Sequence, residues 1–190
     1  MDIGLLVINA GVIQKGKLSN ASLKEVQALM DVNMYHPTAM LKKFLPRLKK
    51  REKQCGIVVV SSTAGSVALP GLATYAASKS YVSYLATAVE AETKAEGTTN
   101  VDFQILAPMF VATQMINSVL IFLKFLFVSS TTDVVCSSLR QLGHPVLPGE
   151  LPITTGTANH DIVAKSLQFV QANTPMFISK LIVYFQYHIK

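Results

Sequence analysis

IVVVSSTAGSVALPGLATYAASK, residues 57–79, is the stretch that decides the fold. Its first four residues are apolar and β-branched, which predicts a buried strand that ends before the two serines at Ser61 and Ser62. A Ser-Ser-x-x-Gly turn follows, and then a helix that is rich in small residues from Tyr75 and ends near Gly97. The stretch therefore joins a buried strand to a closely packed helix through a polar turn.

Three side chains of this stretch have complementary chemistry. Tyr75 and Lys79 are four residues apart, so they lie on one face of the predicted helix. A nearby cation lowers the pKa of a phenol from its usual value of about 10, which would make Tyr75 a general acid or base. The hydroxyl of Ser62, at the strand end, is then placed to bond a substrate carbonyl. A Tyr-x-x-x-Lys pair also occurs on many solvated helix faces, so the pair alone decides nothing.

Two further apolar runs predict strands on either side of this one. Residues 5–8 end in Asn9, Ala10 and Gly11, and residues 101–106 stop shortly before Pro108. Strands that alternate with helices imply parallel crossover units, and hence an α/β sheet whose ligands lie at the carboxyl ends of the strands. The residues that follow the three strands should therefore lie along one edge of the sheet.

A long helix is predicted between the first two strands. Ser22 and Glu25 form a capping box at its start, and apolar residues continue to Leu45, where Pro46 should bend or end the helix. Asn33 lies in its middle. On the pattern alone, an asparagine there is a structural residue that faces solvent.

The second half of the chain is less regular. Val119–Val128 is its most apolar run, but it is too short to span a bilayer and Lys124 interrupts it. We expect a buried or substrate-covering helix there, with a membrane-dipping amphipathic segment as the alternative. Two further helices are predicted, with N-caps at Thr132 or Asp133 and at Asn159 or Asp161.

Composition limits the classes of function. The 190 residues are half apolar and 15% charged, which indicates one domain with a substantial core and excludes a disordered chain. The net charge of +6 comes largely from a basic cluster at residues 42–53, which suits a solvated helix end or, alternatively, an anionic lipid or acidic-ligand surface. No aromatic residues interleave with it, so no nucleic-acid partner is expected. Cys55 and Cys136 follow no metal spacing, so we expect no metal and two reduced thiols.

The Asn-Ala-Gly turn, the helix asparagine, Ser-x12-Tyr-x3-Lys and the later proline occur in one order, and together they resemble the short-chain dehydrogenase/reductases from Gly4 to about Met115. The resemblance implies a partial Rossmann-like, doubly wound α/β fold and an NADP(H) or NAD(H) cofactor. It implies that Tyr75 donates a proton, Lys79 lowers the tyrosine pKa and binds the nicotinamide ribose, Ser62 orients the carbonyl and Asn33 holds a relay water. The implied cofactor-binding residues are Asn9, Ala10, Gly11, Tyr75, Lys79, Pro108, Val111 and Thr113.

Within that family, PMFVATQM at residues 108–115 is most similar to the very-long-chain 3-oxoacyl-CoA reductases and their 17-beta-hydroxysteroid dehydrogenase relatives. A Thr-x-Gly-x-x-x-His pattern at Thr154, Gly156 and His160 is weakly similar to the tail of that branch. The resemblance implies a long-chain acyl or sterol-like substrate, a homodimer and association with the endoplasmic reticulum membrane. Without it, a cytoplasmic protein is the default expectation.

One departure from the family pattern is large. The sequence contains no Thr-Gly-x-x-x-Gly-x-Gly turn, the turn that binds the cofactor pyrophosphate in the family. We therefore expect residues 1–190 to form a single truncated domain that lacks the N-terminal βαβαβα portion, with residues 1–115 as catalytic core and 116–190 as substrate-side and C-terminal region. Two functions remain open: an NAD(P)H-dependent ketoreductase, or a non-catalytic fragment or interaction module that cannot bind cofactor.

Overall fold

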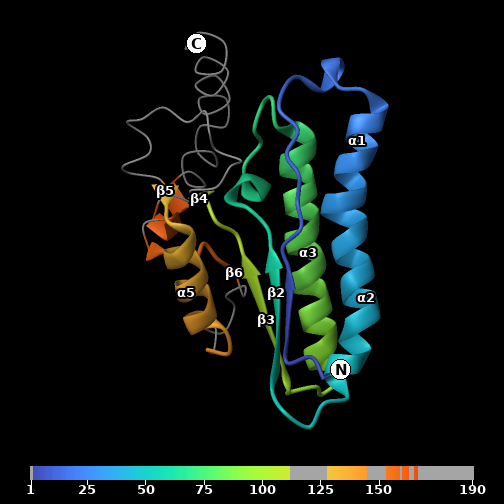
Figure 1. Cartoon of the computed structure of the whole chain (residues 1–190), viewed down its shortest axis with the longest axis vertical. Helices are drawn as coiled ribbons and strands as arrows, with labels where there is room; N and C mark the ends of the chain where they lie inside the picture. The colour runs from blue at the N-terminus through green and yellow to red at the C-terminus, as the bar shows by residue number, and fades with distance from the viewer. Residues whose placement is uncertain (1, 112–127, 145–152, 159, 163–164, 167–190) are drawn as a thin grey trace.

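The computed structural model describes residues 2–111, 128–144, 153–158, 160–162 and 165–166 (Figure 1). Its main sheet has four parallel strands in the order β1-β2-β3-β6. The strands are β1 (Leu5–Ile8), β2 (Cys55–Val60), β3 (Val101–Leu106) and β6 (Ile153–Thr154). The three predicted strands and their parallel arrangement are therefore confirmed.

Short strands were missed by the sequence patterns. β4 (Phe110–Val111) and β5 (Val128–Ser129) pair in parallel beside the main sheet, and β6 adds two residues to its edge. A segment of two residues has no periodicity, so its pairing depends on tertiary contacts that the sequence does not display. Val128 belongs to the apolar run predicted as a helix, and the rest of that run lies outside the described residues.

The predicted helix after β1 consists of three helical segments. α1 (Leu23–Met30) begins with the predicted capping box, and α2 (His36–Lys49) follows a π-helical turn at Asp31–Tyr35. Pro37 explains the turn, because proline lacks an N–H and its ring would clash with the carbonyl of Asn33 in a regular helix. In the wider turn the N–H of His36 bonds to the carbonyl of Asp31 instead.

Pro46 was predicted to bend or end this helix. It does not end the helix, because α2 continues to Lys49. Pro46 is exposed, whereas Leu48 in the last turn is 1% exposed and belongs to the main apolar cluster. Burial of Leu48 offsets the backbone hydrogen bond that the proline removes.

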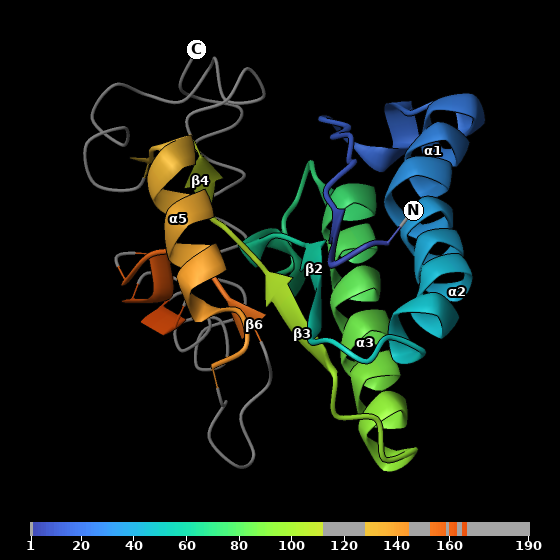
Figure 2. The ribbon, with the colours of Figure 1, turned by 60° about the horizontal axis from the view of Figure 1, so that its bottom comes forward.

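Helices cover the two faces of the sheet unequally. α1 and α2 follow one another end to end beside α3 (Ala73–Ala95) on one face, and α5 (Thr131–Gln141) lies on the other (Figures 1 and 2). Successive residues of β2 alternate accordingly, with Ile57 and Val59 in the cluster under α1–α3 and Val58 in the cluster with Val134 of α5. The α/β class, with a parallel Rossmann-like sheet and flanking helices, is confirmed.

Two predicted N-caps are corrected. α5 is capped by Ser130, whose hydroxyl accepts from the N–H of Asp133 at 3.0 Å, and not by Thr132 or Asp133. In the following helix Ala158 is already helical, and the hydroxyl of Thr157 accepts from the N–H of His160 at 3.4 Å. Asp161 therefore lies inside that helix rather than at its cap, and Asn159 lies outside the described residues.

Candidate active site

The carboxyl ends of β1, β2 and β3 meet at one edge of the sheet, as the sequence predicts. The turn after β2 is bonded to the segment after β3, because the N–H of Thr63 donates to the carbonyl of Pro108 at 3.1 Å. Ser62 is half-buried in this turn, and its hydroxyl accepts from the N–H of Ala64 at 3.2 Å and lies 3.5 Å from the carbonyl of Pro108. Ser62 and Pro108 are therefore neighbours in the fold.

Tyr75 and Lys79 lie in the first two turns of α3 and are buried, with exposed fractions of 9% and 5%. Their four-residue spacing places them on the inner face of the helix, as predicted. The Lys79 Nζ atom lies 5.9 Å from the centre of the Tyr75 ring and donates to the carbonyl of Val60 at 3.0 Å. The ammonium is therefore anchored at the end of β2, beside the phenol.

The electrostatics differ from the prediction. Burial raises the pKa of Tyr75 above its ordinary value, and a hydrogen bond with Ser62 opposes only part of that rise. Burial also lowers the pKa of Lys79 to about 8. The pKa of Tyr75 is therefore raised and not lowered as predicted, and loss of solvent around the phenol is the largest cause. Tyr75 keeps its proton at neutral pH.

Asn33 is 3% exposed, so its predicted solvent-facing position is wrong. Its Oδ1 accepts from the N–H of Val12 at 2.9 Å, and its Nδ2 donates to the carbonyl of Val12 at 2.9 Å and to the hydroxyl of Ser78 at 3.0 Å. These partners are 21 and 45 residues away in the sequence, which is why a local pattern could not reveal them. Asn33 thereby fixes the loop after β1 against α3, and its relay water stays a prediction.

Two glycines allow backbone to approach these side chains closely. A Cβ atom on Gly11 would lie 3.2 Å from Lys79 Nζ and 3.6 Å from Asn33 Oδ1, so the turn after β1 passes directly over both. A Cβ atom on Gly65 would lie 2.7 Å from the carbonyl carbon of Lys79 and from the nitrogen of Ser80. The role of Gly65 was not assigned from the sequence, although the Ser-Ser-x-x-Gly spacing was the available signal.

The residues expected to bind cofactor are placed as follows. Asn9 and Ala10 are exposed after β1, Pro108 lies beside Ser62, and Val111 packs against the cluster under α5. Thr113 lies outside the described residues. The contacts of these residues with a nucleotide stay predictions.

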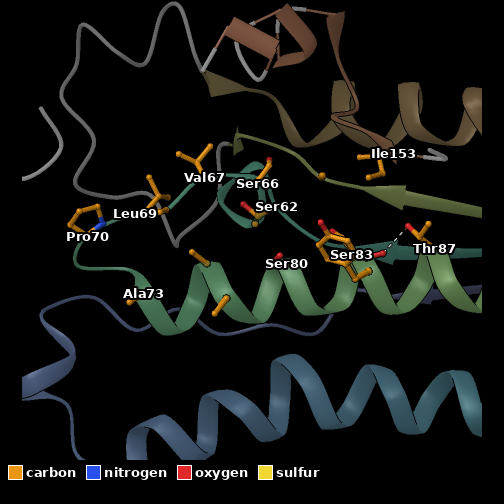
Figure 3. Close-up of a pocket in the computed structure, with 16 residues that line it drawn as sticks. Ser62, Ser66, Val67, Leu69, Pro70, Ala73, Ser80, Ser83, Thr87 and Ile153 are labelled. Carbon is orange, nitrogen blue, oxygen red and sulfur yellow. Dashed lines mark hydrogen bonds between the residues drawn. The ribbon is translucent and has the colours of Figure 1, made fainter. Parts of the chain in front are cut away.

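A groove of about 890 Å³ meets this site at Ser62 (Figure 3). Its walls come from the loop after β2, from one side of α3 and from Ile153 of β6, and most of them are apolar or small side chains. Tyr75 and Lys79 are on a different side of α3 and do not line it. The groove therefore reaches the candidate catalytic set through Ser62.

Within the described part of the chain, no group of three or more histidine, cysteine or acidic side chains is placed to hold a metal ion. Cys55 is buried and Cys136 is exposed, and both are free thiols. Burial raises the pKa of the Cys55 thiol, which disfavours the reactive thiolate.

The fold is shared with solved oxidoreductases. A short chain dehydrogenase from Burkholderia cenocepacia in complex with NADP superposes with a TM-score of 0.73 at 23% identity, over 95% of this chain and 69% of that one. A 3-ketoacyl-(acyl-carrier-protein) reductase from Brucella melitensis complexed with NADH gives 0.68 at 21% identity, over 80% of this chain and 64% of that one. At these identities the likeness shows the fold alone.

Curated proteins match the sequence over part of their length. Dehydrogenase/reductase SDR family member 7B of Rattus norvegicus is 28% identical over 113 residues, which are 60% of this chain and 34% of that protein. Putative steroid dehydrogenase 4 of Caenorhabditis elegans is 26% identical over 175 residues, 90% of this chain and 61% of that protein. The chain thus spans between about a third and three-fifths of the length of these two relatives.

The family described as short chain dehydrogenase matches residues 1–121. That segment holds β1, β2, β3 and all four residues of the predicted catalytic set. This chain belongs to the short-chain dehydrogenase family.

Proposed function

We propose that this chain is an NAD(P)H-dependent reductase of a ketone, with Tyr75 as the proton donor. The observation that carries the proposal is the position of Ser62, Tyr75 and Lys79 at the carboxyl edge of the sheet, with Tyr75 and Lys79 buried and the Lys79 ammonium 5.9 Å from the centre of the Tyr75 ring. A phenol that keeps its proton at neutral pH suits the role of general acid.

The residues present fit the nicotinamide-ribose end of such a cofactor. Lys79 donates one hydrogen bond to Val60, and an ammonium has two further donors for the ribose hydroxyls. Gly11 leaves the turn after β1 without a side chain above Lys79, so that a ligand is able to approach. The bound nucleotide would supply a hydride to the carbonyl carbon. The family likeness, and the NADP and NADH bound by the two solved relatives, support this assignment.

The side chains then have distinct tasks. The single hydroxyl proton of Ser62, which points to the Pro108 carbonyl 3.5 Å away in this structure, would turn to the substrate carbonyl and orient it. Tyr75 would then protonate the carbonyl oxygen as negative charge develops there. Lys79 stabilises the phenolate that remains, because it carries its charge below pH 8. Asn33 holds the loop after β1, and we propose that it also serves the water relay that the family resemblance implies.

For the substrate we propose a 3-oxoacyl or sterol-like carbonyl compound with a long apolar part. The largely apolar groove, which Ser62 helps to line, is suited to such a group. The names of two relatives, a putative steroid dehydrogenase and a 3-ketoacyl reductase, support the same class.

The decisive experiment is NADPH oxidation by purified protein with a long-chain 3-oxoacyl thioester and a 3-ketosteroid. Tyr75→Phe should reduce turnover by about 10³-fold while the protein remains folded, because it removes only a hydroxyl. Tyr81→Phe is the matched control, since Tyr81 is also on α3 but its hydroxyl lies 2.9 Å from the hydroxyl of Thr38 in α2. Equal turnover of wild type and Tyr75→Phe would refute the role of Tyr75.

A second candidate function is a non-catalytic interaction module. One observation favours it: among the described residues β1 lies at the edge of the sheet, and its Leu5 and Val7 are 42% and 50% exposed. In this alternative a homodimer or another chain covers that edge. Calorimetry with NADPH separates the two functions, because saturable binding excludes the module, whereas no binding and no turnover exclude the reductase for this chain.

We also propose contact with an anionic membrane surface, as at the endoplasmic reticulum. Lys42, Lys43 and Lys50 of the basic cluster are exposed, whereas Lys49 pairs with Glu96 and Arg51 with Asp2. No helix in the described residues is long and apolar enough to cross a membrane. Sedimentation with phosphatidylserine vesicles that disappears in high salt would support the contact, and absence of sedimentation at low salt would refute it.

A further inference from the structure

The peptide unit between Pro108 and Met109 is held from both sides. Its carbonyl oxygen accepts from Thr63, through the backbone N–H at 3.1 Å and the hydroxyl at 3.4 Å, and lies 3.5 Å from the hydroxyl of Ser62. Its N–H donates to Nδ1 of His160 at 3.4 Å. Because a peptide unit is planar, a bond that fixes the N–H also fixes the direction of the carbonyl.

His160 is 1% exposed and its ring is bonded at both nitrogens. Nδ1 accepts from Met109, so in the neutral ring Nε2 carries the proton and donates to the hydroxyl of Ser129 at 3.1 Å. Ser129 lies in turn 3.2 Å from the hydroxyl of Thr157. The tautomer and the plane of the imidazole are thus fixed together.

The turn before His160 is built to hold it in place. Gly156 has a φ of +86°, and a Cβ atom there would lie 2.9 Å from Cγ1 of Val134 in α5, so only glycine permits this approach. The hydroxyl of Thr154 accepts from the N–H of Gly156 at 3.0 Å, and Asp161 accepts from the hydroxyl of Thr155 at 2.7 Å. The described residues of the Thr-x-Gly-x-x-x-His pattern are therefore held by several hydrogen bonds around one buried imidazole.

We propose that His160 is a positioning residue for Ser62. It fixes the plane of the Pro108–Met109 peptide, and the carbonyl of that peptide lies beside the Ser62 hydroxyl. The same hydroxyl is the group that would contact the substrate carbonyl. Without an acceptor at Nδ1 the peptide keeps only its bonds to Thr63, so the Pro108 carbonyl is held less firmly in its place beside the Ser62 hydroxyl. The kinetic part of this inference rests on the proposed reductase activity, whereas the structural part does not.

The first test is amide hydrogen exchange at Met109, measured by NMR on 15N-labelled protein. His160→Gln moves the side-chain amide away from the Nδ1 position, and exchange at Met109 should become about tenfold faster through loss of one hydrogen bond. His160→Asn is the matched variant, because its amide oxygen reaches the Nδ1 position, and its exchange rate should stay within about twofold of wild type. Unchanged exchange in His160→Gln, or equal acceleration in both variants, would overturn the proposal.

The second test is a double-mutant cycle between His160→Gln and Ser62→Ala. In the wild-type background, His160→Gln should lower kcat about tenfold with little change in KM, since it loosens the position of the Ser62 oxygen that would orient the substrate carbonyl as charge develops on it. In the Ser62→Ala background the same change should have less than about a twofold effect. Additive losses would show that His160 acts independently of Ser62, and would contradict the proposal. Where the wild type shows no turnover, the proposed reductase fails and the exchange experiment still decides.

Discussion

The face of the sheet under α1–α3 and the face under α5 hold their polar side chains by different means. Under α1–α3, twelve of the described residues form one buried apolar cluster, and Asn33 and Lys79 are carried on the helices that cover it. Under α5 the corresponding cluster has three described members. There, Gln104 and Ser138 bond each other reciprocally at 2.7 and 3.0 Å, and His160 bonds Met109 and Ser129.

The two faces therefore position different residues of the same site. Long elements with a large apolar face place Tyr75 and Lys79, so their positions depend on the whole core. Short strands and turns place Met109 and His160, so their positions depend on a few hydrogen bonds, each of which contributes about 1 kcal/mol. Damage to the first face should unfold the domain, whereas damage to the second should alter the site locally.

Gly65→Ala gives the largest expected effect. The new Cβ atom would meet backbone atoms of α3 at 2.7 Å, and backbone is unable to yield as a flexible side chain does. The free energy of unfolding should fall by about 3 kcal/mol, measured by urea denaturation. Ser66→Ala is the control on the same exposed turn, with an expected loss of about 0.5 kcal/mol. Equal losses of unfolding free energy in the two variants would show that Gly65 is not in close contact with the backbone of α3.

The same contrast explains what the sequence could and could not predict. β2 was located from a continuous apolar run, β3 from a mostly apolar stretch that stops before Pro108, and α3 from small residues and a terminal glycine, because these signals are local. The capping box at Ser22 was found for the same reason. Burial of Asn33, the two-residue strands and the bonds of His160 depend on partners distant in the chain, so no local pattern indicated them.

Adjacent valines of β2 compare the two faces directly. Val59 is 1% exposed under α1–α3, and Val58 is 3% exposed under α5. Val59→Ala should cost about 2.5 kcal/mol and Val58→Ala about 1.5 kcal/mol, because the smaller cluster is better able to collapse around a cavity. Chemical denaturation of both variants measures the difference. A larger cost for Val58→Ala would show that a cavity is more destabilising under α5 than under α1–α3, contrary to the prediction.

Lys79, on the face under α1–α3, should make the free energy of unfolding depend on pH. Its pKa is about 8 in the folded chain and 10.5 as the ordinary value, so between these values the unfolded chain binds more protons and stability rises with pH. This contribution is lost as the pH falls through 8. Relative to Lys79→Met, wild type should gain about 2 kcal/mol of unfolding free energy from pH 8 to pH 10. Parallel pH profiles for the two proteins would show that Lys79 is not desolvated by folding.

The smallest expected effects come from the helix caps, one on each face. Ser22 caps α1 and Ser130 caps α5, each through its hydroxyl, so Ser22→Ala and Ser130→Ala should each cost about 1 kcal/mol. The two variants should differ in which backbone amides exchange faster. Because α5 covers the smaller apolar cluster, Ser130→Ala should accelerate amide exchange within α5 alone, whereas Ser22→Ala should accelerate exchange across α1, α3 and the strands together. Exchange measured residue by residue distinguishes the two patterns. Global acceleration in Ser130→Ala would mean that α5 belongs to the same cooperative unit as the opposite face, and that the site is held by one core rather than two.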